Sequence, residues 1–134
     1  MMMMRILCIL FISMQLVSCI RQETIRQEDF NQQAVNLRRL ANAVQGEVWR
    51  GPEQNADVLA LACQRDPSLC EPFASDSVLV KVVDDNVILL LCDAGRKQAL
   101  IEDAPCTMQT DRRAWEESSK PCEFTLDVAA ICGN

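Results

Sequence analysis

Cysteine is the residue type that offers most chemistry in this chain, because the 134 residues include eight cysteines and no histidine. Thiols serve as nucleophiles, metal ligands or disulfide partners. Zinc sites combine cysteine with histidine or use Cys-x2-Cys pairs, whereas the closest cysteines here, Cys63 and Cys70, have six residues between them. The lack of histidine excludes Ser-His-Asp and Cys-His catalysis. The cysteines therefore predict disulfides, which persist outside the cytosol.

Adjacent acidic residues are the other candidates for chemistry, and they form three pairs: Asp84-Asp85, Glu102-Asp103 and Glu116-Glu117. Two carboxyl groups held at a suitable separation can hydrolyse a glycoside. Neighbouring residues on a strand point to opposite faces, so we interpret all three pairs as solvated surface groups. The Asp84-Asp85-Asn86 segment lacks the ligand spacing of an EF-hand. We expect no catalytic residue, metal ligand or cofactor, and hence no enzyme.

The first eighteen residues predict export. Residues 1–5 end in a positive charge, and residues 6–17 form a mainly apolar run of twelve. This run is too short to cross a bilayer, which needs about 20 apolar residues. The pattern is typical of a signal peptide over residues 1–18. No later segment is long and apolar enough to span a membrane.

Leu16-Val17-Ser18-Cys19 resembles the lipobox of bacterial lipoproteins. In that family the chain is cut before the cysteine, which is then lipidated on its sulfur and on its new amino group. The resemblance implies lipidation of Cys19 and, since Ile20 stands where an aspartate favours retention in the inner membrane, an outer-membrane anchor with the protein facing the periplasm. The alternative is an ordinary signal peptide and a soluble secreted protein.

The cysteines beyond Cys19 are even in number and can pair fully: Cys63, Cys70, Cys92, Cys106, Cys122 and Cys132. A Cys63–Cys70 bridge would join the end of a helix to the loop that follows. Cys92 and Cys106 would lie about 30 Å apart if residues 87–92 and 97–103 pair as antiparallel strands, which is too far for a disulfide. They should therefore bridge to Cys122 and Cys132, in an order that stays open.

An amphipathic helix is predicted over residues 24–45. Its apolar residues recur in steps of four and three and form one stripe: Phe30, Ala34, Leu37, Ala41, Val44 and Val48. Thr24 and Gln27 have the spacing of a capping box, and Gly46 is a typical helix stop. The stripe favours packing on the domain that follows. A short coiled coil with a partner protein is the alternative.

A second helix is predicted from Pro52 to residue 64, followed by a β-hairpin. Residues 77–83 and 87–92 are rich in Val, Leu and Ile, and the three residues between them suit a turn in which Asn86 adopts a positive φ. The second arm is apolar on both faces. We therefore expect a central strand that the two helices cover.

The remaining elements predicted are a third strand over 97–103, a short helix over 110–119 with Trp115 pointing inward, and a last strand over 122–128. The fold class is then α+β: a small antiparallel sheet of three or four strands, covered by N-terminal helices and stapled by three disulfides. The predicted organisation is a signal peptide (1–18), an anchor with an amphipathic helix (19–50) and a disulfide-bonded head (51–134).

Charge divides the exported part of the chain. Residues 19–50 carry five basic and four acidic groups, net +1, whereas residues 51–134 carry seven basic and fifteen acidic groups, net −8. An acidic head repels nucleic acid and anionic lipid and attracts a cationic protein. Cys92-Asp93-x-Gly95 resembles the motif of bacterial lysozyme-inhibitor lipoproteins, although the tyrosines that accompany that motif are absent here.

These observations lead to a functional hypothesis: an envelope lipoprotein that acts as a non-catalytic binding module and neutralises a cationic protein partner, without binding nucleic acid. A structural lipoprotein of a secretion or conjugation assembly, docked through the helix over 24–48, is the alternative. A secreted effector without an anchor is a third possibility.

Overall fold

The computed structural model describes residues 28–53, 56–106, 112–114 and 120–133. The chain divides into two compact units, Met1–Gln33 and Ala34–Asn134. Helix α1 is described over residues 28–49, and its part from Ala34 onward belongs to the second unit, which holds all the other elements.

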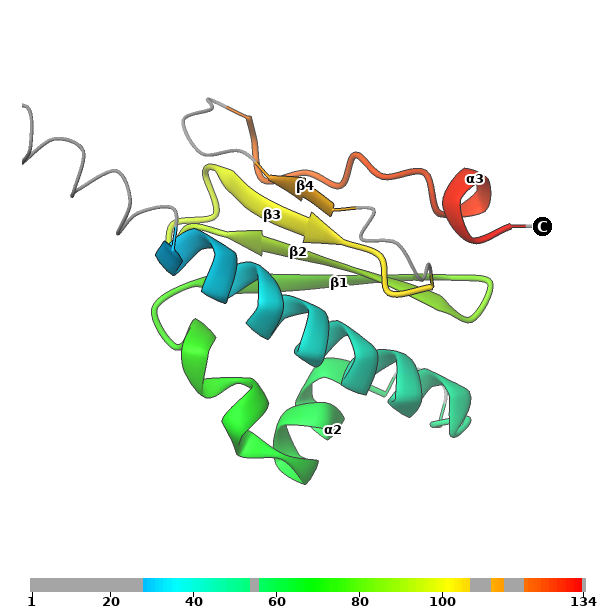
Figure 1. Cartoon of the computed structure of the whole chain (residues 1–134). Coiled ribbons are helices and arrows are strands. Elements are labelled where there is room, and N and C mark those ends of the chain that lie inside the picture. Colours follow the sequence, from blue (N-terminus) through cyan, green and yellow to red (C-terminus); the bar gives the residue numbers. More distant parts are fainter. Residues whose placement is uncertain (1–27, 54–55, 107–111, 115–119, 134) are drawn as a thin grey trace, which may run out of the picture. The chain divides into compact units, whose positions relative to one another are not determined.

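The second unit contains one sheet and several short helices (Figure 1). The helices after α1 are α2 (Val58–Arg65), two 3-10 turns (Pro67–Leu69 and Glu71–Phe73) and α3 (Val128–Cys132). The strands are β1 (Ser77–Val83), β2 (Asn86–Cys92), β3 (Ala99–Asp103) and β4 (Arg112–Ala114). They pair antiparallel in the order β1-β2-β3-β4. The α+β fold with an antiparallel sheet is confirmed.

Strand β2 is the centre of the fold. Its residues from Val87 to Cys92 are all fully buried, because the strand has a neighbour on each edge and a cover on each face. Helix α1 covers one face and places Leu37, Ala41 and Val44 in the core with no exposed surface. The predicted packing of this helix on its own domain is confirmed.

The cover of the other face differs from the prediction. Ile88 packs with Leu126 and Val128, and Leu90 lies in a cluster with Phe124, so the C-terminal segment lies against this face instead of the second helix. Helix α2 is joined to α1 by the ion pair between Arg65 and Glu47. The C-terminal segment covers the sheet face that α2 was expected to cover. The expectation that two N-terminal helices enclose the central strand was therefore wrong for one of its two faces.

The hairpin turn between β1 and β2 is one residue shorter than predicted. Val83 pairs with Asn86, which leaves Asp84 and Asp85 as the two turn residues. Their φ angles are 48° and 64°, as a type I′ turn requires, whereas Asn86 starts the next strand. The prediction of a positive φ at Asn86 was wrong, because aspartate also tolerates this region and the two-residue turn matches the twist of the strands.

Helix α1 runs past Gly46 and ends after residue 49. Gly51, with a φ of 70°, stands just beyond this end in the left-handed conformation that commonly follows a helix. The predicted stop at Gly46 was wrong because neighbouring helical residues hold that glycine in the helix. The second helix also begins later than Pro52: Asp57 caps α2 and its side chain accepts a hydrogen bond from the Ala60 N–H.

The C-terminal predictions need two corrections. Residues 112–114 form strand β4, not part of a helix, and pair with Ile101–Asp103 at the edge of the sheet. Trp115 and the rest of 110–119 lie outside the described residues. Residues 122–127 form no strand, although their side chains alternate between buried and less buried, and Val128 begins helix α3.

Three disulfides hold these segments together, as expected. Cys63 bridges to Cys70, Cys92 to Cys122 and Cys106 to Cys132, with Cα–Cα distances of 5.7, 5.8 and 5.6 Å. The first joins the end of α2 to the loop after it. The other two tie the C-terminal segment to both ends of the β2–β3 pair, which resolves the order that the sequence left open. In the described part of the chain no helix has the length and hydrophobicity that a membrane crossing requires.

Candidate functional site

The acid pair at the end of β3 is buried, which corrects its interpretation as a solvated pair. Glu102 has no exposed surface and accepts four hydrogen bonds from the C-terminal segment. The Thr125 N–H lies 2.9 and 3.0 Å from the two carboxylate oxygens, the Thr125 hydroxyl 2.7 Å from one of them, and the Leu126 N–H 2.9 Å from the other. The side chain of Glu102 thus takes the place of a strand partner for residues 125 and 126.

Asp103 faces the opposite side of the sheet, toward α1. One of its oxygens lies 3.0 Å from the guanidinium of Arg38, which also donates a hydrogen bond to the Ala104 carbonyl at 3.3 Å. The Asp103 side chain is 2% exposed. Paired buried charges of this kind position α1 on the sheet. Both acids of the pair are therefore structural.

Two polar residues of α1 that the sequence did not single out complete the link between the helices and the hairpin. Gln45 donates from Nε2 to the Asp85 carbonyl at 2.6 Å and accepts from the Val87 N–H at 3.0 Å. Glu47 accepts a hydrogen bond from Arg65 of α2, with 2.6 Å between the Arg65 Nε and the Glu47 Oε1, and another from Arg50. The hydrogen bond from Arg65 is the main cause that lowers the pKa of the Glu47 carboxyl below its usual 4.5.

The predicted site residues are thus distributed between the core and the surface. The six paired cysteines and the second acid pair stabilise the fold, whereas Asp84 and Asp85 are exposed at the hairpin tip. Cys19 and Glu116-Glu117 lie outside the described residues. Within the described parts of the chain, no group of three or more Cys, Asp or Glu side chains could hold a metal ion.

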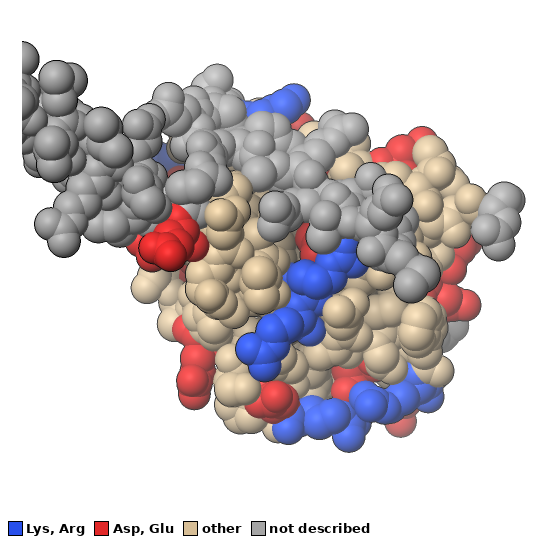
Figure 2. Space-filling view, viewed as in Figure 1, with Lys and Arg blue, Asp and Glu red and all other residues tan. Residues whose placement is uncertain are grey.

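The charged surface is not uniformly acidic. Lys and Arg side chains form a band across the face shown in Figure 2, with Asp and Glu along its margins. The helices contribute Arg38, Arg39 and Arg65, and Arg50 directly follows the end of α1. The turns at the two ends of β1 are acidic instead, with Asp76 before the strand and Asp84 and Asp85 after it. None of these three acids has an ion pair among the described residues.

The free edge of β1 is the most distinctive surface near these acids. Because Val83 and Asn86 flank a two-residue turn, they form a hydrogen-bonded pair, and such pairs alternate along the ladder. The N–H and C=O groups of Val78, Val80 and Val82 therefore point away from β2. No other described strand pairs with this edge. Val82 is 46% exposed, and the only charged residue within the strand is Lys81.

The candidate functional site is therefore an interaction surface: the edge of β1 with the three acidic residues at its ends. Sequence reasoning identified the acidic hairpin tip but not the edge, because the strand order cannot be read from one strand alone. No protein family, characterised protein or solved structure matches this chain at a significant level.

Proposed function

We propose that this protein is an exported bacterial lipoprotein, lipidated at Cys19 and anchored in the outer membrane facing the periplasm, whose domain binds a cationic protein without catalysis. Three disulfides that use all six cysteines from Cys63 onward support folding in an oxidising compartment. Two or more acyl chains at Cys19 would hold the domain stably at a membrane.

The observation that carries the binding role is the charge of the surface after the buried acids are removed from the count. Residues 51–106 and 120–133 contain twelve acidic and five basic side chains, and of these only Glu102 and Asp103 are buried. Ten acidic groups against five basic ones leave a net charge of −5 on the surface of these residues, and Arg38, Arg39 and Arg50 of the same unit reduce this excess to −2. Such an excess accelerates encounter with a cationic partner and favours its complex.

The stripe of α1 supports this role over a docking role in a secretion or conjugation assembly. Leu37 and Val44 are fully buried within the domain, so they offer no surface to another protein. An assembly would have to use a different face of the domain.

The binding role is tested with the native chain, extracted in detergent and kept oxidised. Its affinity for basic cell-wall hydrolases is measured by calorimetry at low and high salt, with cytochrome c as a basic control protein that lacks lytic activity. The proposal expects a hydrolase that binds more tightly than the control, with an affinity that falls as salt rises. Equal affinity for the control, or no binding at low salt, contradicts it.

A further inference from the structure

We infer that the free edge of β1 binds an extended segment of the partner by strand addition, and that this segment has an alternating apolar centre with a basic residue at each end. This inference rests on the proposed binding function and specifies the surface that performs it.

The backbone of β1 supplies the first requirement. Every second residue from Val78 to Val82 directs its backbone N–H and C=O groups away from β2. These groups form one line along the edge, which is the template that an added strand uses. Natural edge strands are commonly protected by proline, a bulge or several charges. Strand β1 has no proline and pairs with β2 without a register shift, and Lys81 is its one charge.

The side chains of the edge define the partner's centre. The side chains of Val78, Val80 and Val82 lie on the α1 face of the sheet, because Leu79 and Val83 between and beside them pack on the opposite face with the C-terminal segment. A bound strand would place every second side chain beside these valines. Cross-strand pairs with β-branched residues stabilise such contacts, so the centre of the partner should carry apolar residues at alternate positions.

The acidic ends define the partner's termini. Asp76 directly precedes β1 and Asp84 directly follows it in the hairpin turn, so one acid stands next to each end of the edge. Burial raises the pKa of the Asp76 carboxyl, so a cation beside it would offset part of the cost of its charge. A basic residue at each end of the added strand would therefore meet an acid.

The same charges disfavour a second copy of this chain as the occupant. Antiparallel pairing of two β1 strands over their full length places Val80 opposite Val80. This register also brings the end of each β1 that Asp76 precedes next to the end of the other copy that Asp84 follows, so like charges come close at both ends. Like charges directly opposite one another destabilise a strand pair. A heterologous segment with basic ends avoids this repulsion.

Synthetic peptides test the inference on the oxidised full chain. The first probe is the blocked peptide Lys-Thr-Val-Thr-Val-Thr-Val-Thr-Lys, and the second has Glu at both ends. The third is the first peptide with N-methyl groups on its valines, whose N–H groups would face β1. We expect the first to bind, and the second to bind about fivefold more weakly or worse because two favourable charge pairs become repulsive. The third should lose binding.

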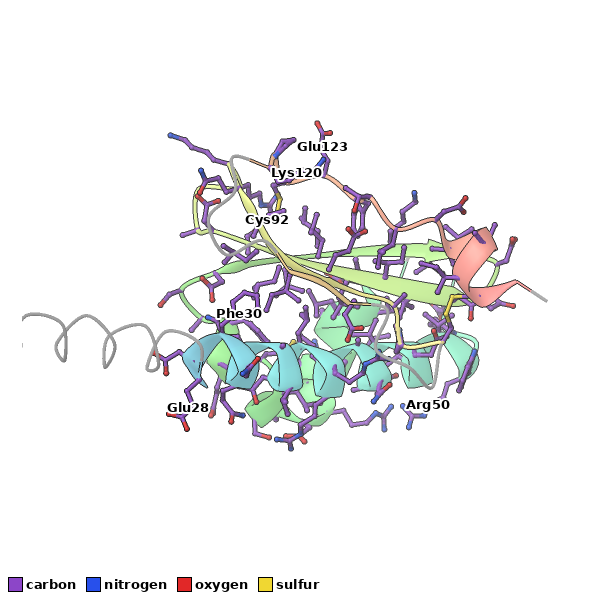
Figure 3. The ribbon with its side chains drawn as sticks, turned by 45° about the horizontal axis from the view of Figure 1, so that its top comes forward. Glu28, Phe30, Arg50, Cys92, Lys120 and Glu123 are labelled. Atoms are coloured by element: carbon purple, nitrogen blue, oxygen red, sulfur yellow. A yellow bond between two sulfur atoms is a disulfide. The ribbon has the colours of Figure 1, made fainter. Side chains whose placement is uncertain are left out.

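Variants of the chain separate the edge from general electrostatics. Asp84→Asn should weaken binding of the first peptide about two- to fivefold. Glu123→Gln removes the same charge from a side chain that points away from the ribbon in Figure 3, and it should leave the affinity for this peptide unchanged. Val80→Pro removes one outward N–H without removing a bond to β2 and should lower affinity about tenfold or more. If this variant does not fold, the N-methylated peptide still decides the question.

Three results would overturn the inference. These are equal binding of the N-methylated peptide, no binding of any peptide at millimolar concentration, and a dimer of the free chain that Val80→Pro dissociates, which would assign the edge to a second copy. Salt-sensitive binding of a cationic hydrolase without binding of the peptides would reject strand addition and leave the proposed function intact. If neither the hydrolase nor the peptides bind, strand addition and the proposed function are both rejected.

Discussion

The backbone N–H of Thr125 lies 2.9 and 3.0 Å from the two carboxylate oxygens of Glu102, a residue with no exposed surface on the third strand of the sheet. The Leu126 N–H and the Thr125 hydroxyl complete the set of donors. An acidic side chain thus satisfies a stretch of backbone that reaches no neighbouring strand. Because it links the sheet to its C-terminal cover, this relationship gives the most direct test of how that cover is held.

Replacing this acid by its amide should destabilise the fold. In Glu102→Gln the charged acceptor becomes a neutral amide, so charge-assisted hydrogen bonds are replaced by weaker neutral ones and the Thr125 N–H keeps one acceptor instead of two, at a cost of about 1–3 kcal/mol. Glu123→Gln makes the same chemical change at an exposed site and should stay within about 0.5 kcal/mol of the unmodified chain. Urea unfolding without reductant measures both. Equal stability of the two variants would show that the Glu102 contacts are not needed.

Removing the amide of Gln45 should loosen the hairpin where it meets α1. Gln45→Ala leaves the buried Val87 N–H without its acceptor, at a cost of about 1–3 kcal/mol. Asn42→Ala is the control, because Asn42 is an exposed residue of the same helix. Amide hydrogen exchange should show faster exchange at Val87 in the first variant only. Unchanged protection of that amide would contradict the assigned contact.

The ion pair between Glu47 and Arg65 should make stability depend on acid pH. The pKa of Glu47 is lower in the folded state than its ordinary value of 4.5, so the stabilisation is fully present above that value and is lost as the pH falls through the folded pKa. Unfolding free energies measured between pH 3 and neutrality should therefore fall less steeply in Glu47→Gln than in the unmodified chain. Parallel curves for the two proteins would rule out this contribution.

The disulfides should differ in their contribution to stability, because they close loops of different length. The Cys63–Cys70 bridge spans 7 residues and the Cys106–Cys132 bridge spans 26. Chain entropy predicts a loss of about 2 kcal/mol when the first pair is changed to alanine and about 3.5 kcal/mol for the second. Thermal unfolding of the two double variants would compare them. A larger loss from the first pair would mean that chain entropy does not set the order.

The sheet was predictable because its apolar runs are local signals. The runs of Val, Leu and Ile on both sides of Asp84 and Asp85 locate two strands, and the all-apolar second arm indicates its central place. The turn itself was placed one residue too long, since aspartate and asparagine both tolerate a positive φ. Local preferences alone do not distinguish a two-residue from a three-residue turn.

The C-terminal cover and the buried acids were not predictable, because each depends on contacts across more than 20 residues. From the sequence alone Glu102 and Asp103 look like surface groups. In the fold Glu102 contacts Thr125 on one face of the sheet and Asp103 contacts Arg38 on the other. The alternation of Phe124, Leu126 and Val128 correctly indicated an extended segment with one buried side. It suggested a strand because the pattern of side chains does not reveal whether the backbone bonds to a strand or to a carboxylate.

Intact mass spectrometry of the native, unreduced protein tests the central claim most directly, which is that this domain matures in an oxidising compartment of the envelope. The result expected is a chain that begins at Cys19, carries acyl groups there and lacks six hydrogens, two for each of its three disulfides. An uncut chain of 134 residues with free thiols would contradict export, lipidation and the crosslinked fold together.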